Sequence, residues 1–373
     1  MRIALVHDYL TQFGGGERVL KVLMDMFPNA PVYTLLHDKK VTEGLLDGSR
    51  IKTSFLQNIP LARSRHRLFP LFMPIIIEQF NLSKYDLVIS ASHSFGKGVI
   101  TGPNTLHISY CFTPMRYVWD DSHRYVREFT VPSWLRSLIP FPLTYVRLWD
   151  SFAADRVDSF VAISNFVAKR IKKYYQRDAM VVYPPVDCGA YYIAKTIGNR
   201  FLIVSRLMSY KRIDLAIEAF NRLGLPLDIV GTGPEEEKLK KIAGPDIKFH
   251  GFLSDEQIKK MFSECRAFIF PQEEDFGLTV LEAAASGRPV IAFAGGGALE
   301  TVTSDTGIFF ADQTVESLSA SVQKVLKMDL DPNKIRERAL LFSTERFKVN
   351  FMEMINREWN KFPRKRVEKQ VSV

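Results

Sequence analysis

The feature that most constrains this chain is a regular alternation of short β-branched and aromatic runs with amphipathic stretches of helical length. Such alternation predicts parallel β-sheets with helices on both faces, which is the α/β class. We expect a first series of strands at residues 3–9, 32–36, 86–92, 106–111, 159–164 and 180–183. We expect a second series at residues 201–205, 227–230, 248–251, 267–271, 289–293 and 307–310.

A proline pair separates the two series of strands. Pro184 and Pro185 stiffen the backbone, which ends the first unit, and residues 188–199 then have the pattern of a linker. A length of 373 residues also suits two domains better than one. We expect a last helix at 346–361 that crosses back onto the first domain, before a basic tail. The predicted division is 1–187, 188–345 and 346–373.

Charge is distributed unevenly along the sequence. The net charge is +9, and residues 1–190 hold 23 Lys and Arg against 16 Asp and Glu, whereas residues 191–373 hold 27 against 25. A basic first half and a basic tail indicate an anionic partner, either a lipid headgroup, a nucleotide or a nucleic acid. Three scattered cysteines and the lack of an apolar run of about 18 residues favour a cytoplasmic protein.

Two stretches of the first half depart from the strand and helix rhythm. Residues 63–80 and 131–149 both combine arginines with large apolar and aromatic side chains. Such a combination can seat a protein on an anionic membrane surface. The alternative is a pair of helices that cover the core, and both interpretations stay open.

A glycine-rich turn follows the first predicted strand. Gly14, Gly15 and Gly16 precede an amphipathic helix, so bare backbone amides and a helix N-terminus can meet a phosphate there. The spacing is not G-x-G-x-x-G and no Lys-Ser/Thr follows, which disfavours a dinucleotide oxidoreductase or an NTPase. A tight turn without a ligand is the alternative.

Two cations follow the first strand of the second half. Arg206 and Lys211 lie in the loop after residues 201–205, at the carboxyl end of that strand, where open α/β sheets bind ligands. Arg206 can hold a diphosphate in bidentate fashion while Lys211 adds a compact charge. A solvated charged loop is the alternative.

Two carboxylates accompany the next helix start. Glu274 lies in an acidic loop, and Glu282 lies about one turn into a helix that we expect to begin near Leu278. Carboxylates beside a diphosphate would repel it unless they face neutral hydroxyl groups. We therefore expect these two side chains to recognise sugar hydroxyls.

Together these motifs resemble glycosyltransferase family 4, whose members are retaining enzymes of the GT-B fold, with two Rossmann-like domains facing a central cleft. The resemblance rests on Gly14-Gly15 before Glu17, on Arg206 with Lys211, and on Glu274 with Glu282. Residues 113–120, Thr-Pro-Met-Arg-Tyr-Val-Trp-Asp, are similar to the bacterial mannosyltransferase subgroup that builds O-antigen and exopolysaccharide.

The resemblance implies a set of contacts to the donor phosphates. Gly14 and Gly15 would approach the donor phosphate, and Arg206 and Lys211 would bind the diphosphate. Further backbone groups would cap the phosphates, namely those of Gly277, Leu278 and Thr279.

The resemblance also implies contacts to the rest of the donor. Glu274 would hold the transferred sugar, Glu282 would bind the ribose, and His93 would lie beside the sugar and help to stabilise the reacting centre. The backbone at Phe249 and Gly251 would contact the nucleobase. The implied catalytic set is His93, Arg206, Lys211 and Glu274.

The implied reaction moves a hexosyl group, in the first place mannosyl, from GDP-mannose or another nucleotide sugar to a lipid-linked saccharide. Asp329-Leu330-Asp331 has the D-x-D spacing of metal-dependent transferases, but it precedes a proline and suits a turn or helix cap better than a metal site. We therefore expect that the reaction needs no metal or other cofactor. The resemblance places the enzyme in the cytoplasm, peripherally on the membrane. The alternatives are a nucleotide-sugar epimerase of GT-B fold and a basic nucleic-acid-binding protein.

Overall fold

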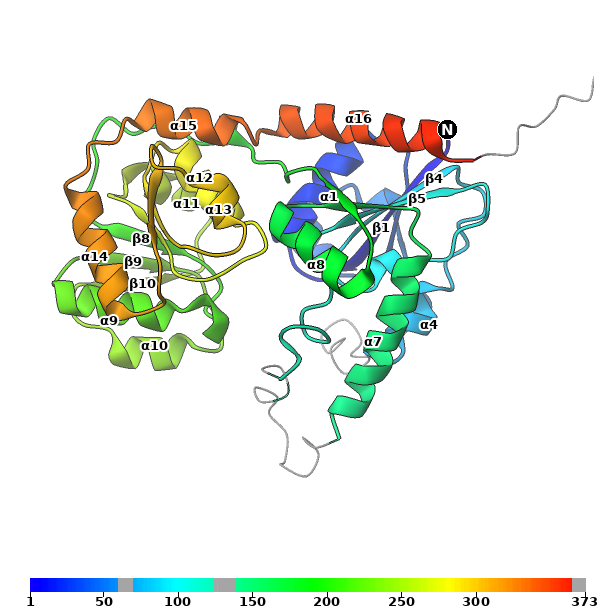
Figure 1. The fold of residues 1–373 in the computed structure, drawn as a ribbon, viewed down its shortest axis with the longest axis horizontal. Helices are drawn as coiled ribbons and strands as arrows, with labels where there is room; N and C mark the ends of the chain where they lie inside the picture. The colour runs from blue at the N-terminus through cyan, green and yellow to red at the C-terminus, as the bar shows by residue number, and fades with distance from the viewer. Residues whose placement is uncertain (60–69, 124–125, 127–137, 364–373) are drawn as a thin grey trace, which may run out of the picture. The chain divides into compact units, whose positions relative to one another are not determined.

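The computed structural model describes residues 1–59, 70–123, 126 and 138–363, and these divide into two compact units (Figure 1). Unit 1 comprises Met1–Tyr183 together with the chain from Lys348 onward, and unit 2 comprises Pro184–Phe347. Each unit has its own parallel β-sheet and its own buried core. The first unit ends directly before the proline pair, four residues earlier than the predicted boundary.

Unit 1 contains a seven-stranded sheet in the order β3-β2-β1-β4-β5-β6-β7, with parallel pairing throughout. Its strands are β1 (Ile3–Leu10), β2 (Val32–His37), β3 (Ile51–Thr53), β4 (Leu87–Ser92), β5 (Leu106–Cys111), β6 (Ser159–Ala162) and β7 (Ala179–Val181). Six of them match predicted strands to within a few residues. The edge strand β3 was not predicted, because it has only three residues and none of them is buried.

The helices of unit 1 follow from apolar residues at helical spacing. In α1, Val19, Leu20 and Leu23 are buried together on one face, as a period of 3.6 residues requires. The helices are α1 (Gly15–Met26), α2 (Lys39–Thr42), α4 (Met73–Ile77), α7 (Pro140–Asp155) and α8 (Asn165–Tyr175). Short 3₁₀ turns are η1 (Gly48–Arg50), η2 (Phe55–Asn58) and η4 (Gly96–Gly98).

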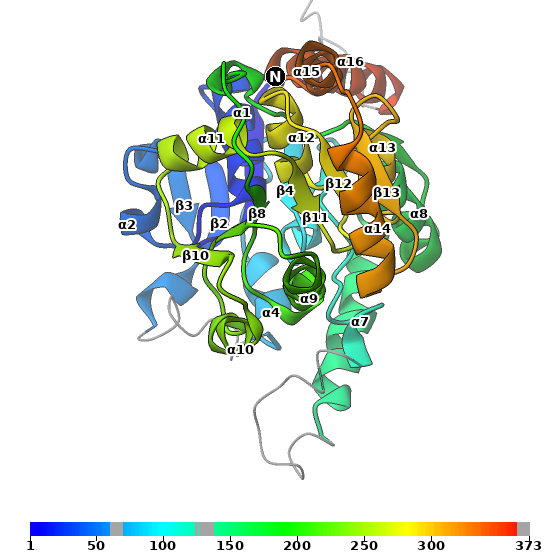
Figure 2. The ribbon, with the colours of Figure 1, turned by 90° about the vertical axis from the view of Figure 1, so that its left-hand side faces the viewer.

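Unit 2 contains a six-stranded parallel sheet in the order β10-β9-β8-β11-β12-β13, seen end on in Figure 2. Its strands are β8 (Phe201–Val204), β9 (Leu227–Val230), β10 (Ile247–Gly251), β11 (Phe268–Phe270), β12 (Val290–Phe293) and β13 (Gly307–Phe310). Its helices are α9 (Ile213–Leu223), α10 (Glu236–Ile242), α11 (Asp255–Glu264), α12 (Leu278–Ala285), α13 (Ala298–Thr301), α14 (Val315–Leu326) and α15 (Pro332–Leu340), with 3₁₀ turns η5 (Cys188–Ala190) and η6 (Ser209–Lys211). All six strands match the second predicted series.

The predicted linker at 188–199 packs against unit 2 instead of hanging between domains. Arg336 of α15 donates to the carbonyl oxygens of Cys188 and Tyr191 at 3.0 and 2.9 Å. The side chains of Cys188 and Tyr191 are buried, and their carbonyl oxygens have a donor in Arg336, so this part of the segment is held against unit 2. In α15 itself, Asp331 accepts from the Asn333 amide at 2.8 Å, so it caps the helix as expected.

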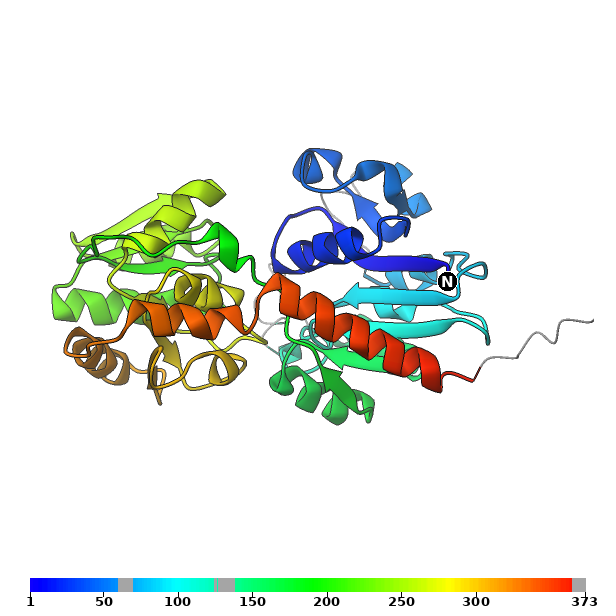
Figure 3. The ribbon, with the colours of Figure 1, turned by 90° about the horizontal axis from the view of Figure 1, so that it is seen from above.

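The last helix, α16 (Thr344–Lys361), extends from unit 2 into unit 1 (Figure 3). Its Phe351 ring lies 5.5 Å from the Tyr110 ring of β5, in an edge-to-face contact that covers the sheet of unit 1. The helix begins two residues before the predicted start. Residues 364–373, which hold most of the basic tail, lie outside the described residues.

The two apolar stretches of the first half contain α4 and α7. Both helices cover the core of unit 1, through Ile76 and Ile77 of α4 and through Leu143 and Val146 of α7. The parts at 60–69 and 131–137, with Arg63, Arg65, Arg67, Trp134 and Arg136, lie outside the described residues. In the part of the chain that the structure describes, every helix is too short or too polar to cross a lipid bilayer.

Candidate functional site

The strand order of each sheet reverses at one point, between β1 and β4 in unit 1 and between β8 and β11 in unit 2. Open parallel sheets bind ligands outside the carboxyl ends of their strands at such a reversal. Gly14 and His93 follow β1 and β4, and Arg206 and Glu274 follow β8 and β11. Each unit therefore carries predicted residues at its own switch point, three of them in unit 1 and most of the others in unit 2.

In unit 2, Lys211 and Glu274 form an ion pair. Lys211 ends the η6 turn after β8, while Glu274 lies in the loop after β11, so the pair joins the two loops at the switch point. Both side chains are largely buried, and Gln272 Nε2 donates to Glu274 Oε1 at 3.3 Å. The structure thus brings together the cation predicted for the diphosphate and the carboxylate predicted for the sugar.

Arg206 differs from Lys211 in its surroundings. It is exposed, and among the described residues its guanidinium group makes no hydrogen bond or ion pair. The backbone beneath it is tightly held, because a Cβ atom at Gly231 would lie 1.9 Å from the Ser205 carbonyl oxygen. Gly231 has φ +129°, which also excludes most side chains. A fixed loop therefore presents the positive charge of Arg206 at the sheet edge.

The helix α12 begins beside this loop, as predicted. Gly277 at its N-cap has φ +88°, and a Cβ atom there would lie 2.9 Å from Cζ of Phe270. Leu278 and Thr279 of the first turn are half-buried, and amides at a helix start lack intrahelical acceptors. These amides can therefore donate to an anion at the same edge of the sheet as Arg206.

A second glycine run, which was not predicted as part of the site, supports Glu274. The amide of Gly297 donates to the Glu274 carbonyl oxygen at 2.8 Å, and a Cβ atom at Gly296 would lie 2.1 Å from that oxygen. Gly295, Gly296 and Gly297 follow β12, so three consecutive glycines after a predicted strand were the available signal.

The other predicted positions of unit 2 are placed as follows. Glu282 lies in the second turn of α12 and is 9% exposed. The Phe249 side chain is half-buried and packs against the core of unit 2. Gly251 has φ +63° at the end of β10, and its carbonyl oxygen accepts from the Gly231 amide at 2.8 Å.

In unit 1, the glycine turn is closed by a carboxylate. The amide of Gly14 donates to Glu17 Oε2 at 2.8 Å, and Glu17 Oε1 lies 3.6 Å from Nε2 of the buried His7. Burial raises the pKa of Glu17, but the hydrogen bond and charge of His7 and the Gly14 amide outweigh burial and lower it. The amide of Gly14 is thus already bonded to Glu17, so a phosphate at this turn would contact neighbouring backbone groups instead of that amide.

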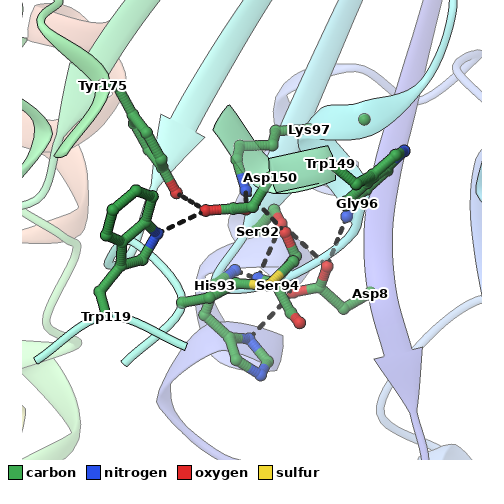
Figure 4. Close-up of polar contacts among 12 residues, drawn as sticks. Asp8, Ser92, His93, Ser94, Gly96, Lys97, Trp119, Trp149, Asp150 and Tyr175 are labelled. Carbon is green, nitrogen blue, oxygen red and sulfur yellow. Dashed lines mark hydrogen bonds and ion pairs between the residues drawn. The ribbon is translucent and has the colours of Figure 1, made fainter. Parts of the chain in front are cut away.

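The loop after β4 wraps around a buried carboxylate, that of Asp8 in β1 (Figure 4). Asp8 accepts from Ser92 Oγ at 2.8 Å and from the amides of His93, Ser94 and Gly96 at 2.8, 3.1 and 2.6 Å. Burial alone would raise the pKa of Asp8, yet the charge and hydrogen bond of His93 lower it far below its usual range. Asp8 was not predicted, although a lone acid within an apolar strand was visible.

Asp8 also orients the predicted His93. Nδ1 of His93 lies 3.0 Å from Asp8 Oδ2, while the side chain remains 44% exposed. Burial lowers the pKa of His93, but the neighbouring Asp8 carboxylate outweighs burial and raises it. The exposed edge of the ring is therefore available to a ligand, with its orientation set by Asp8.

Behind this loop lies a buried ion pair between Lys97 and Asp150 (Figure 4). Lys97 Nζ donates to the Ser94 carbonyl oxygen at 3.0 Å, and Asp150 accepts from Trp119 Nε1 and from the Tyr175 hydroxyl group, each at 2.8 Å. The pair ties the His93 loop to α7 and α8 and to the segment 113–120. Arg170 of α8 holds the same segment by donating to Asp120 Oδ1 at 2.7 Å.

The comparison with protein families gives a match in unit 2. Residues 194–341 match the family model of glycosyl transferases group 1. This range lies within unit 2 and includes Arg206, Lys211, Glu274 and Glu282.

Among curated proteins, the chain is similar to O-antigen chain mannosyltransferase C of Escherichia coli. The two are 36% identical over 167 residues, which are 39% of this chain and 44% of that protein. The chain thus spans less than half the length of this relative. It is also 22% identical to alpha-1,3/1,6-mannosyltransferase ALG2 of Dictyostelium discoideum over 408 residues, covering 90% of this chain and 92% of that protein.

Among solved structures, the chain is similar to Anabaena Alr3699/HepE, determined in complex with UDP. The TM-score is 0.70 at 17% identity, and the match covers 96% of this chain and 100% of that one. With its two parallel α/β sheets, the chain therefore has the GT-B fold, so the predicted fold class is confirmed.

Proposed function

We propose that this protein is a retaining glycosyltransferase that moves a hexosyl group from a nucleotide diphosphate sugar to a lipid-linked saccharide. The observation that carries the proposal is the ion pair of Lys211 and Glu274, next to the exposed Arg206 and the start of α12. A cation, a carboxylate and helix-start amides at one sheet edge suit a ligand that has both a diphosphate and sugar hydroxyls.

In this proposal the phosphates meet positive charge on two sides. Arg206 forms paired hydrogen bonds to the diphosphate, Lys211 adds a compact charge, and the amides of Gly277, Leu278 and Thr279 cap the phosphate oxygens. Charge grows on the diphosphate as its bond to the anomeric carbon breaks. Donors already held in place stabilise this charge without rearrangement, which is the largest contribution that such a site makes to the rate.

The sugar and nucleoside are read by groups that suit neutral partners. Glu274 accepts from sugar hydroxyls, Glu282 accepts from the ribose, and the backbone at Phe249 and Gly251 borders the base. His93 lies beside the sugar, while Gly14 and Gly15 bring backbone close to the donor phosphate. The acceptor oxygen bonds to the anomeric carbon on the same face that the phosphate leaves, so the configuration is retained. The proton of the acceptor hydroxyl group passes to an oxygen of the leaving phosphate.

The donor and acceptor classes are the finer part of the proposal. The names of the two mannosyltransferase relatives favour a mannosyl group and therefore GDP-mannose as donor, with other nucleotide sugars as alternatives. The similarity to an O-antigen enzyme favours a lipid-linked acceptor in surface polysaccharide synthesis, bound by the N-terminal domain. We place the reaction at the cytoplasmic face of a membrane, without a metal cofactor.

A nucleotide screen tests this function. Ligands that bind only the native state raise the melting temperature according to their concentration and Kd, so GDP, UDP, TDP and their sugars are compared by thermal shift. We expect one nucleotide and its sugar to raise the Tm, and acceptor-dependent release of the nucleotide to follow. Conversion of the sugar without an acceptor would replace the transferase by an epimerase. Binding of duplex DNA with no nucleotide effect would overturn both enzyme interpretations.

A further inference from the structure

The helix α7 of unit 1 carries a row of large apolar side chains that face away from the core. Phe141, Tyr145, Leu148 and Phe152 follow one another at intervals of four, three and four residues, which places them on one face of the helix. Their exposed fractions are 73, 45, 56 and 63%. The row runs about 17 Å along the helix. We call these four residues the α7 stripe.

The opposite face of the same helix is also apolar. Leu143, Val146, Ala153 and Ala154 are buried in unit 1, so α7 is apolar on two faces. A surface helix of a water-soluble protein normally has an apolar face toward the core and a polar face toward water. A helix whose outer face is also apolar is expected to contact a second apolar surface besides the core. The helix α4 is a neighbour of α7, because Trp149 of α7 donates to Glu78 at the end of α4 at 2.9 Å, and Ile75 of α4 is also 54% exposed.

The charged residues of α7 do not interrupt the stripe. Between 138 and 155 they are Arg147, Asp150 and Asp155. Arg147 donates to the Val118 carbonyl oxygen at 2.5 Å, and Asp150 is buried with Lys97. Asp155 lies at the last position of the helix. A pairing helix of a coiled coil carries charges on both sides of its apolar row, and these are missing from the stripe.

The unit that bears the stripe is strongly basic. Unit 1 holds 30 Lys and Arg against 18 Asp and Glu, a net charge of +12, whereas unit 2 holds 20 against 23, or −3. Exposed lysines lie on the neighbouring helix α8, which contacts α7 through the hydrogen bond of the Tyr175 hydroxyl group to Asp150. Lys169, Lys172 and Lys173 of α8 are exposed.

We propose that unit 1 binds the surface of an anionic lipid bilayer, with the α7 stripe inserted among the headgroups and the α8 lysines against the lipid charge. Aromatic and aliphatic side chains beside lysines are the combination that holds a helix in the plane of a bilayer interface. A second copy of the chain fits the α7 stripe less well than a bilayer does, because two copies of unit 1, each with a net charge of +12, repel each other. An anionic bilayer would be the surface at which the proposed transferase works. The evidence for this binding, however, is the α7 stripe and the net charge of unit 1, and it does not depend on the transferase activity.

Vesicle sedimentation tests the proposal with the full chain. The protein is mixed at low salt with vesicles of phosphatidylcholine, with or without phosphatidylglycerol, and the pelleted fraction gives a partition coefficient. Phe141→Ser, Leu148→Ser and Phe152→Ser remove stripe side chains. Leu299→Ser is the matched control, because Leu299 of unit 2 is 55% exposed against 56% for Leu148. Thermal unfolding establishes that each variant folds.

We expect wild type to pellet only with the anionic vesicles, and each stripe variant to bind about tenfold more weakly, as the loss of a large apolar contact predicts. Leu299→Ser should bind like wild type, and Lys172→Glu with Lys173→Glu should weaken binding most at low salt. The proposal is wrong if folded stripe variants bind like wild type. It is also wrong if the wild-type protein stays in solution in the presence of anionic vesicles. It is wrong too if the stripe substitutions convert a dimer into a monomer and leave vesicle binding unchanged. Nucleotide shifts measured without vesicles report on the transferase separately.

Discussion

Nδ1 of His93 lies 3.0 Å from Oδ2 of Asp8, and the same carboxylate accepts the His93 amide at 2.8 Å. One buried acid thus fixes both the backbone and the ring of the predicted catalytic histidine. Since Nδ1 faces Asp8, Nε2 is the ring nitrogen left for a substrate, on a side chain that is 44% exposed.

The first prediction concerns the protonation of His93. Its pKa is raised in the folded protein, so its pairing with Asp8 stabilises unit 1 fully below the ordinary pKa of 6.5. This stabilisation is lost as the pH rises through the folded pKa. We expect Asp8→Asn to move the His93 titration to lower pH, measured by NMR, with His93→Gln identifying the signal. An unchanged titration in folded Asp8→Asn would refute the assigned coupling.

The second prediction concerns the buried ion pair. Lys97→Met leaves Asp150 charged and buried, with Trp119 and Tyr175 as its remaining donors. Removing one partner of a buried pair costs about 3–5 kcal/mol, which denaturant unfolding measures. Lys169→Met, at an exposed position of α8, should change the unfolding free energy by less than about 0.5 kcal/mol. Equal effects of the two variants would contradict a structural role for the pair.

The third prediction concerns Lys211. We expect Lys211→Ala to lower donor turnover by about 10²–10³-fold, the usual effect of removing one preorganised group from developing charge. Lys259→Ala provides the control, because Lys259 of α11 pairs with Glu256 in the same unit. The rate is followed as release of the nucleotide with acceptor present. Near-wild-type rates for Lys211→Ala would remove this residue from the mechanism.

The fourth prediction concerns Gly277 at the start of α12. Gly277→Ala forces a side chain into φ +88° and brings its Cβ atom to 2.9 Å from Phe270. Gly224→Ala is a matched control, since Gly224 has φ +62° and a Cβ atom there would meet no other atom within 4 Å. Left-handed strain costs about 1–2 kcal/mol in both, and the clash adds to it only at 277. Equal melting temperatures for the two variants would contradict the tight contact.

Most of the fold could be predicted from sequence because parallel strands buried on both faces appear as short apolar runs. Twelve strands followed from this pattern, and β3 did not, because Ile51–Thr53 is short and has no fully buried residue. The segment 188–199 also escaped prediction, since its packing depends on Arg336, which lies more than 130 residues further along the chain. Contacts of that kind leave no local signal.

The candidate site was predictable where a residue follows a strand and carries charge. Arg206, Lys211 and Glu274 meet this condition, and topology brings the loops of β8 and β11 together. The supports of the site were not predictable in the same way. Asp8 acts from within a strand, and Gly296 acts by letting backbone approach Glu274, so each depends on a neighbour distant in sequence.

The most direct test of the proposed donor site is the affinity for a nucleoside diphosphate, measured by calorimetry with GDP and UDP. Arg206→Ala should weaken the preferred nucleotide at least about tenfold, because a charged, bidentate contact is lost. Arg222→Ala is the control, since Arg222 of α9 is exposed and pairs with Glu316. We expect weaker binding for Arg206→Ala alone, and equal affinity of wild type and both variants would contradict the proposed donor site.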